Sequence, residues 1–424
     1  MPLQALMCRS ILWLLPHFAA PGGFRYPVPL ASLAMLAALV HLAATLRLRI
    51  GDRAMPKVRR RLARWYVWLA CSALYGQVLL QRSGADVLAL VDGPVLYWQA
   101  ALQRMVQVAL AIAAFEIVRT TRVDAPRLMR WWLQGTCVAV ALHAAVYVAS
   151  SDYLALRAGT FVEGNHGGLY YLLSLFVALD HHRLRAGRGS RAAVGACLLG
   201  LLLTQSSAAM IVLLVALAAR QLAVSRDLGS AVKRQLLLLA GAAIVIPLLL
   251  AVGADFGTLD KLFEEDVTAA SFSRIDRLLA IENALDLFLA SPIVGHGVQS
   301  FGFLANDYLS GPLAQVYDWS FRRIPNNIYA ELLSETGIVG LLLLLVFIGG
   351  LILRSRRPGH DPGGNFLAGL TALLVYWLAF PTYSLVFIWV YFALVHRGAA
   401  THALASQGIA WRKPSGGPPA TAVS

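Results

Sequence analysis

A succession of long apolar segments constrains this chain more than any other feature of its sequence. A bilayer core of about 30 Å takes roughly 20 apolar residues for one helical crossing. About twelve segments are apolar enough for this role, at 5–20, 29–46, 64–81, 98–118, 129–149, 168–181, 192–204, 207–223, 235–253, 327–353, 365–380 and 383–396. Because 58% of the residues are hydrophobic and only 14% are charged, we predict an all-α integral membrane protein and not two or three soluble domains.

The charged residues between these segments predict how the chain is threaded. Lysine and arginine in short loops stay on the cytoplasmic side. The basic loops all follow even-numbered segments, at 47–64, 119–130, 183–191, 220–234 and 354–357. Both termini are therefore predicted to be cytoplasmic. The division that follows is transmembrane helices 1–9 in 1–253, a large outer loop in 254–326, helices 10–12 in 327–397, and a disordered cytoplasmic tail rich in Pro, Gly and Ser in 398–424.

Several classes of protein are disfavoured by composition. The net charge of +14 sits in the inter-segment loops and not among aromatic residues of a soluble face, so no nucleic-acid partner is expected. The four cysteines lie inside apolar segments without shared spacing, which argues against a disulfide framework and a cysteine metal site. The sequence contains no Walker loop, dinucleotide fingerprint, HExxH or GxSxG motif, so nothing indicates a soluble cofactor.

The interval 254–326 is the longest polar stretch between apolar segments, and we expect most of the chemistry there. Within it, Ser273 to Ala290 has apolar residues at helical spacing, at Ile275, Leu278, Leu279, Leu285 and Phe288. This pattern predicts an amphipathic helix that lies on the outer membrane surface or caps the bundle. At its end, His296 stands between Gly295 and Gly297, which favours a tight turn.

Arginines on the predicted outer side break the positive-inside pattern. They are Arg157, Arg274, Arg277, Arg322 and Arg323. A guanidinium can clamp a phosphate through two parallel hydrogen bonds, so these side chains could hold a lipid-linked diphosphate at the outer leaflet. The alternative is that they are solvated charges that pair with nearby acidic residues.

Two further polar features stand near the predicted membrane surface. The loop LRAGTFVEGNHGG offers Glu163, Asn165 and His166 beside Arg157, and a carboxylate with an imidazole could do acid-base work. Arg104 lies about two turns inside the fourth segment. It could line a cavity, but we expect it to extend to the interface by snorkelling.

The order of four short motifs resembles a known family. RxGTFxxxN spans Arg157 to Asn165, SxxR ends at Arg274, SPIxGxGxxxF begins at Ser291, and NxYxxxxxExGxxG runs from Asn327 to Gly340. Together with the large penultimate outer loop, they resemble the superfamily of O-antigen ligases and Wzy-type polymerases of bacterial surface polysaccharides.

This resemblance implies a GT-C-like membrane glycosyltransferase of the bacterial inner membrane. Its donor would be a glycan linked to undecaprenyl diphosphate, and its acceptor a glycan hydroxyl, joined with inversion and without a metal ion or cofactor. Membrane lipid and a chain-length regulator are the further partners it allows. By position, Arg157 and Arg274 match the arginines that hold the donor diphosphate, with Arg277, Arg322 and Arg323 as further contacts. Substrate contacts are also assigned to Asn165, His166, Asn326, Asn327, Tyr329 and Glu335.

One departure decides between the members of the superfamily. The ligases carry a histidine followed by Asn, Ser or Gln, nine residues and Gly-x-x-small, whereas this chain keeps the spacing with Asn326 at the histidine position. An amide cannot take up a proton at neutral pH as imidazole can. We therefore favour a polymerase that extends lipid-linked repeat units, with a ligase as the alternative. A lipid-linked sugar transporter and a non-catalytic scaffold are the remaining alternatives, and the base stays open among Glu163, Asp276 and Glu335.

Overall fold

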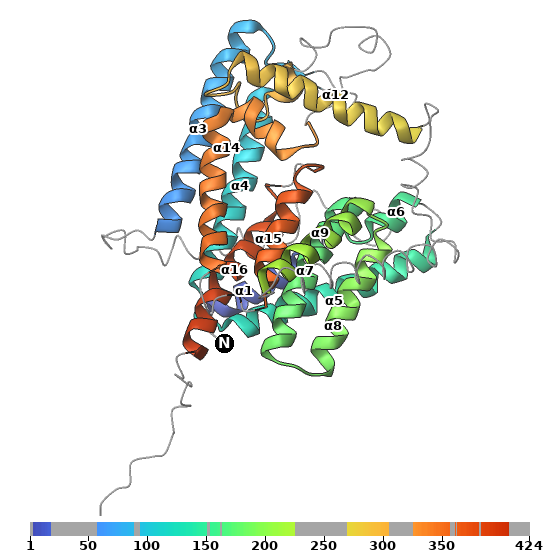
Figure 1. Ribbon diagram of the computed structural model, residues 1–424. Helices are drawn as coiled ribbons and strands as arrows, with labels where there is room; N and C mark the ends of the chain where they lie inside the picture. Colours follow the sequence, from blue (N-terminus) through green and yellow to red (C-terminus); the bar gives the residue numbers. More distant parts are fainter. Residues whose placement is uncertain are drawn as a thin grey trace, which may run out of the picture.

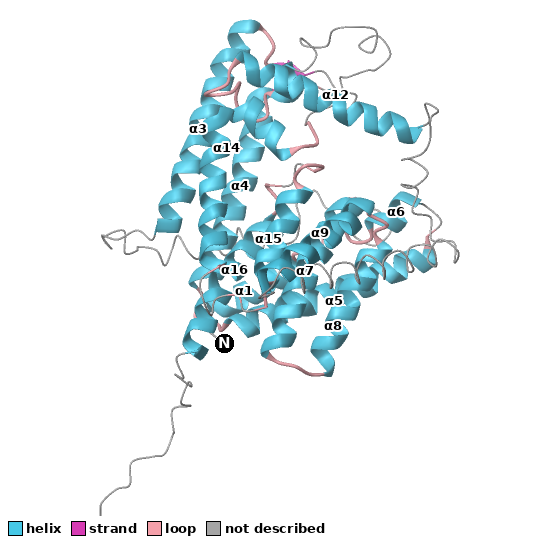
Figure 2. Ribbon diagram, viewed as in Figure 1, coloured by secondary structure: helices cyan, strands magenta, loops and turns pink. Residues whose placement is uncertain are grey.

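The computed structural model describes residues 3–17, 57–88, 94–150, 153–161, 163–224, 269–304, 325–356, 361, 363–380 and 383–406. Nearly all of these residues are helical (Figure 2). The helices are α1 (Leu3–Leu14), α3 (Lys57–Ser83), α4 (Tyr97–Thr120), α5 (Ala125–Ala149), α6 (Tyr153–Ala158), α7 (Gly164–Leu184), α8 (Arg188–Leu203), α9 (Ser207–Val224), α12 (Ala269–Ala290), α13 (Phe301–Leu304), α14 (Ile328–Ser355), α15 (Asn365–Tyr376) and α16 (Val386–Ser406). Two short strands, β1 (Val87–Leu88) and β2 (Val95–Leu96), pair antiparallel between α3 and α4.

The apolar segments predicted from sequence coincide with these helices wherever the structure describes them. Among the described helices, α4, α5, α9 and α14 are long and apolar enough to cross a membrane, so the described residues are those of a predominantly α-helical membrane protein. The predicted segments 29–46 and 235–253 lie outside the described residues. The number of twelve crossings and the outer position of 254–326 stay predictions.

Local sequence explains two of the helix boundaries. A tight hairpin joins α8 to α9, and the chain reverses within three residues at Thr204 to Ser206. Helix α14 begins at the side chain of Asn327, which accepts hydrogen bonds from the backbone N–H groups of Tyr329 and Ala330 at 2.9 and 3.1 Å. Such N-cap contacts satisfy donors that a helix leaves unpaired at its start.

Helix α14 is bent at Gly337, whose φ of 65° and ψ of −175° are not helical. The bend exposes carbonyl groups that neighbouring segments satisfy. The N–H of His296 donates to the Ser334 carbonyl at 3.0 Å, and that of Gly297 donates to the Glu335 carbonyl at 2.8 Å. Trp68 Nε1 of α3 donates to the Thr336 carbonyl at 3.0 Å. The turn predicted around His296 is thereby confirmed, and it is docked against the break in α14.

Aromatic side chains pack the helices together. Trp65 of α3 stacks on Trp389 of α16 with ring centroids 5.6 Å apart, and Trp389 stacks on Phe347 of α14 at 5.7 Å. Trp132 of α5 stacks on Tyr170 of α7 at 5.4 Å. Because lipid tails are as apolar as these rings, close packing and not water exclusion holds such contacts together in a membrane.

Side-chain contacts also join the helix ends that lie next to the basic loops, which are predicted to be cytoplasmic. Arg397 of α16 donates to the carbonyls of Thr121 and Val123 after α4. Arg220 of α9 donates to Asn365 Oδ1 at the start of α15 at 2.7 Å. These helix ends therefore lie together at one end of the bundle, which fits the predicted alternation. Helix α16 continues through Ser406, into the tail predicted from 398, and 407–424 lie outside the described residues.

Helix α12 lies across the ends of α3, α4 and α14 that are farthest from the basic loops (Figure 1). The helix itself was predicted, but the face that it buries was predicted only in part. Leu278 and Leu285 are 61% and 43% exposed, whereas Ala280, Ala284 and Leu287 pack against residues of α3, α4 and α14. Small alanine side chains let helix backbones approach closely. The contact face therefore combines these alanines with Leu287 and with Leu279 of the sequence pattern, which packs against the same cluster.

Candidate functional site

The motif from Arg157 to Asn165 folds back on the hairpin between α8 and α9. Arg157, in the last turn of α6, donates from Nε to the Thr204 carbonyl at 3.4 Å. Gly164 starts α7 so close to both that a Cβ there would stand 2.9 Å from the Thr204 oxygen and 3.1 Å from the Arg157 oxygen. A side chain at position 164 would push these segments apart, so glycine is required for the close approach.

Asn165 links this motif to the end of α15. Its Oδ1 accepts a hydrogen bond from Ser206 at 3.0 Å, and its backbone carbonyl accepts one from the Tyr376 hydroxyl at 2.6 Å. Ser206 also lies 3.4 Å from the Tyr376 hydroxyl. The loop before α7, the hairpin and α15 are thus held in one arrangement by a small polar network.

Glu163 and His166 form a pair at the edge of this network. Glu163 Oε1 lies 3.2 Å from His166 Nε2, and the carboxylate is the more exposed partner. His166 precedes the membrane segment predicted at 168–181. Burial lowers the pKa of His166, while the Glu163 carboxylate acts in the opposite direction. A neutral imidazole beside a carboxylate can accept a proton.

A second arginine, Arg277 of α12, lies near the end of α15. The guanidinium of Arg277 lies over the ring of Phe380, 5.2 Å from its centroid, and Phe380 packs on Tyr376 at 5.4 Å. The charges of Arg157, Arg277 and Glu163 all act on the Tyr376 hydroxyl. We call Arg157, Glu163, Asn165, His166, Arg277 and Tyr376 the outer-end cluster. With a neutral histidine it carries two positive charges against one negative charge, which favours an anionic ligand.

The N-terminal end of α14 packs against the same part of α15. Asn327 Nδ2 donates to the Leu378 carbonyl at 3.0 Å, and the Tyr329 hydroxyl donates to the Leu374 carbonyl at 2.7 Å. Asn326, the residue at the histidine position of the ligases, is half-buried with a φ of 53°. Asn327 and Tyr329 thus hold the wall of the site in the structure, while substrate contacts for them stay predictions.

Glu335 does not belong to the outer-end cluster. Its side chain is fully buried inside the bundle, near Glu331 and Arg104. Arg104 lies 3.6 Å from Glu331 Oε1 and donates to Ser384 Oγ at 2.7 Å. The expectation that Arg104 snorkels to the interface is wrong, because these buried partners hold its guanidinium inside the protein.

The remaining predicted residues are only partly placed. The side chain of Arg274 in α12 lies outside the described part of the structure, as do the side chain of Asp276 and the whole of Arg322 and Arg323. Sequence reasoning missed Ser206, Tyr376 and Phe380. Aromatic residues near the end of a membrane segment, where tyrosine and tryptophan gather at interfaces, were the available signal for the last two.

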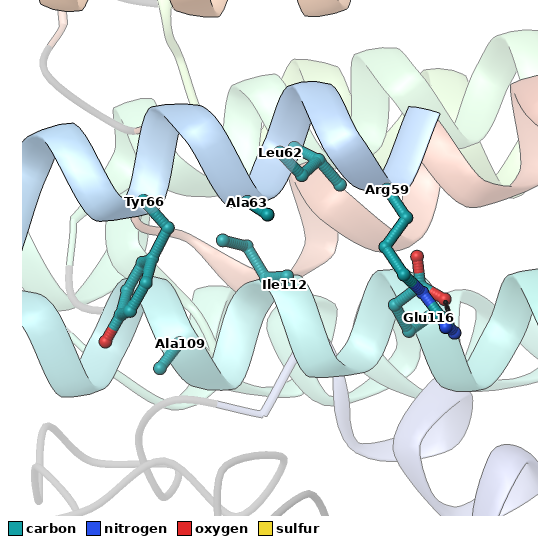
Figure 3. Close-up of a pocket in the computed structure, with 7 residues that line it drawn as sticks. All are labelled: Arg59, Leu62, Ala63, Tyr66, Ala109, Ile112 and Glu116. Carbon is teal, nitrogen blue, oxygen red and sulfur yellow. Dashed lines mark hydrogen bonds and ion pairs between the residues drawn. The ribbon is translucent and has the colours of Figure 1, made fainter. Parts of the chain in front are cut away.

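Two further features bear on the binding of a metal ion or a ligand. Within the described residues, no cluster of three or more His, Cys, Asp or Glu side chains could hold a metal ion. A groove of about 220 Å³ lies between α3 and α4, with Tyr66 at one end and the Arg59–Glu116 ion pair at the other (Figure 3). It is separate from the outer-end cluster, since it lies toward the opposite end of α3 from Leu80, which packs against α12.

The described helices are those of a helical membrane protein. A basic site, the outer-end cluster, lies at one end of the helix bundle. Residues 192–345 match the family model described as O-antigen ligase. This match confirms the resemblance predicted from the motifs. Members of the family are glycosyltransferase-like membrane ligases and polymerases of bacteria, which use a lipid-linked glycan and an acceptor as substrates. The match includes Arg277, Asn326 and Glu335 but begins after Arg157 and Asn165. A search of curated proteins finds no match.

Proposed function

We propose that this protein polymerises oligosaccharide repeat units linked to undecaprenyl diphosphate, at the outer face of the bacterial inner membrane. The observation that carries the proposal is that two basic segments far apart in the chain meet the end of α15: Arg277 lies over Phe380, which packs on Tyr376, and the motif from Arg157 to Asn165 accepts a hydrogen bond from the Tyr376 hydroxyl. A site with two guanidinium groups suits a diphosphate, because each can donate two parallel hydrogen bonds to phosphate oxygens.

In the proposed mechanism the two arginines stabilise the leaving diphosphate. As the acceptor hydroxyl oxygen bonds to the anomeric carbon, the bond from that carbon to the diphosphate oxygen breaks with inversion. Preorganised positive charge stabilises the negative charge that develops on the diphosphate. The hydroxyl proton passes to the Glu163–His166 pair, whose 3.2 Å separation lets the two groups share it.

Arg277, which the sequence also offered as a diphosphate contact, is one arm of the proposed clamp, and the role of Arg274 stays a prediction. Both residues lie on α12, and the contacts of Arg277 with Phe380 support its place beside Tyr376. We expect Arg277→Ala to lower polymerisation about 10²-fold, corresponding to the ~3 kcal/mol typical of one lost charge contact in a transition state. Arg277→Lys keeps the charge but not the planar fork, so it should retain intermediate activity.

The assay is conversion of a purified lipid-linked repeat unit into polymer, with each variant reconstituted at equal protein amount. Arg188→Ala, which removes an exposed arginine at the start of α8, is the matched control and should be fully active. Equal activity of wild type and Arg277→Ala would refute the clamp role.

An O-antigen ligase is the second candidate, because the matching family model carries that description. A ligase joins finished polysaccharide to lipid A-core or protein. Loss of a polymerase leaves single repeat units on the cell surface, whereas loss of a ligase leaves long chains on the lipid carrier. A gel of surface and carrier-linked glycan from a deletion strain therefore separates the two functions. A transporter would instead leave the purified protein without glycan-joining activity.

A further inference from the structure

A second charged group lies inside the bundle, one helical turn further along α14 than Asn327. We call Arg104, Glu331 and Glu335 the buried acid cluster. Glu331 and Glu335 stand four residues apart, on one face of α14, and both side chains are fully buried. Arg104 approaches them from α4, with its guanidinium 5.2 Å from the ring centroid of Tyr383.

The carboxyl groups of this cluster have few hydrogen-bond donors. No side chain donates to the four oxygens of Glu331 and Glu335, and the backbone N–H groups of Gln299 and Phe301 act on the Glu335 carboxyl alone. The 3.6 Å separation of Arg104 from Glu331 is an ion pair longer than a hydrogen bond. The guanidinium instead donates to Ser384 Oγ. With the Gln299 amide turned so that its oxygen faces Arg104, that oxygen accepts from Arg104 Nη2 and Nε at 2.9 and 3.1 Å. Buried polar atoms without partners are rare and require an explanation.

The charges of the cluster do not balance when both carboxyl groups are ionised. One guanidinium against two carboxylates leaves one negative charge, and Arg104 is the cation that acts on both of them. The other titratable groups that face the cluster are Tyr97, Tyr383 and His296, the last with Nδ1 3.4 Å from the Ser334 carbonyl. An uncompensated buried charge costs several kcal/mol, so two neighbouring carboxylates beside one cation do not both stay ionised.

We propose that Glu331 and Glu335 together bind one proton, which leaves a single negative charge to pair with Arg104. The proton supplies a donor between the two side chains, because the carboxyl O–H of one glutamate can hydrogen-bond to the carboxylate oxygen of the other. The proton belongs to the pair and not to either residue alone. The site is neutral and links α4, α14, the loop before α13 and the segment before α16. It does not depend on the glycan reaction.

Infrared spectroscopy of the purified full chain in detergent tests the proposal directly. A protonated carboxyl group has a C=O stretching band that shifts in D₂O. Wild type should show one such band that is absent from both Glu331→Gln and Glu335→Gln, because either substitution leaves Arg104 with one ionised carboxylate. Arg104→Met should strengthen the band, because both carboxyl groups must then be protonated.

Thermal unfolding gives a second readout. Each single glutamine variant should melt near wild type, whereas Glu331→Gln with Glu335→Gln should melt much lower, because Arg104 is then buried without a counter-charge. Adding Arg104→Met to that pair should restore part of the loss. Wild-type spectra without a band that either glutamine variant removes would overturn the proposal. A melting temperature that depends on sodium, with choline as the control cation, would also overturn it and assign the site to a metal cation.

Discussion

Replacing Gly337 by alanine tests whether the break in α14 holds the loop at Ser291 to Gly297. The φ and ψ of Gly337 lie in a region that only glycine occupies readily, so a side chain there costs about 1–3 kcal/mol in backbone strain. The added Cβ would also stand 2.1 Å from the Ile293 carbonyl oxygen. That distance is far inside van der Waals contact, so the loop would have to move.

Movement of the loop threatens three backbone hydrogen bonds. Ile338 donates to the Pro292 carbonyl at 2.9 Å, and the N–H groups of His296 and Gly297 donate to α14. Each such bond contributes about 1 kcal/mol. With the strain added, we expect Gly337→Ala to lower the free energy of unfolding by about 4 kcal/mol.

Gly349 provides the matched control within the same helix. A Cβ at Gly349 would meet nothing within 4 Å, and alanine is favoured over glycine in a helix interior by about 1 kcal/mol. Gly349→Ala should therefore stabilise the protein. The measurement is equilibrium unfolding in mixed micelles, followed by tryptophan fluorescence. A Gly337→Ala variant as stable as Gly349→Ala would refute the reasoning.

Three other changes test the neighbouring contacts. Asn327→Ala removes the cap of α14 and the bond to the Leu378 carbonyl, so the free energy of unfolding should fall by about 2 kcal/mol, and an unchanged value would contradict the capping role. Tyr376→Phe removes the bond to the Asn165 carbonyl and should lower stability by about 1 kcal/mol, with Tyr75→Phe, at an exposed position, as its neutral control. His166 has a lowered pKa in the folded state, so the unfolded state binds more protons and stability should fall as the pH drops below about 6.5; His166→Gln should flatten that fall in pH-dependent melting curves.

The membrane helices could be predicted because each one corresponds to a continuous apolar segment of the sequence. The turn around His296 was also readable, since Gly295 and Gly297 have φ values of 70° and 113° that favour glycine. These features depend on residues that are close in sequence. Local chemistry alone therefore predicts them.

The site was only partly predictable because it depends on contacts between distant segments. Tyr376 donates a hydrogen bond to Asn165, and Phe380 lies under the guanidinium of Arg277. No local sequence pattern links these residues. Arg104 was expected at the interface because its counter-charge, Glu331, lies on a helix far along the chain. Glu331 was overlooked for the same reason: an acidic residue in the first turn of a helix also suits the helix dipole.

The shortness of α15 has a consequence for the depth of the site. Its 12 residues rise about 18 Å, whereas a hydrocarbon core is about 30 Å thick. A helix that starts at one surface of the bilayer and ends at Tyr376 therefore stops about 12 Å short of the other. A headgroup bound at Arg277 and Tyr376 must be drawn below the level of its neighbours, or the bilayer must thin around the protein to meet it. Bilayer thickness thus becomes a determinant of access, and lipids with shorter chains should ease it.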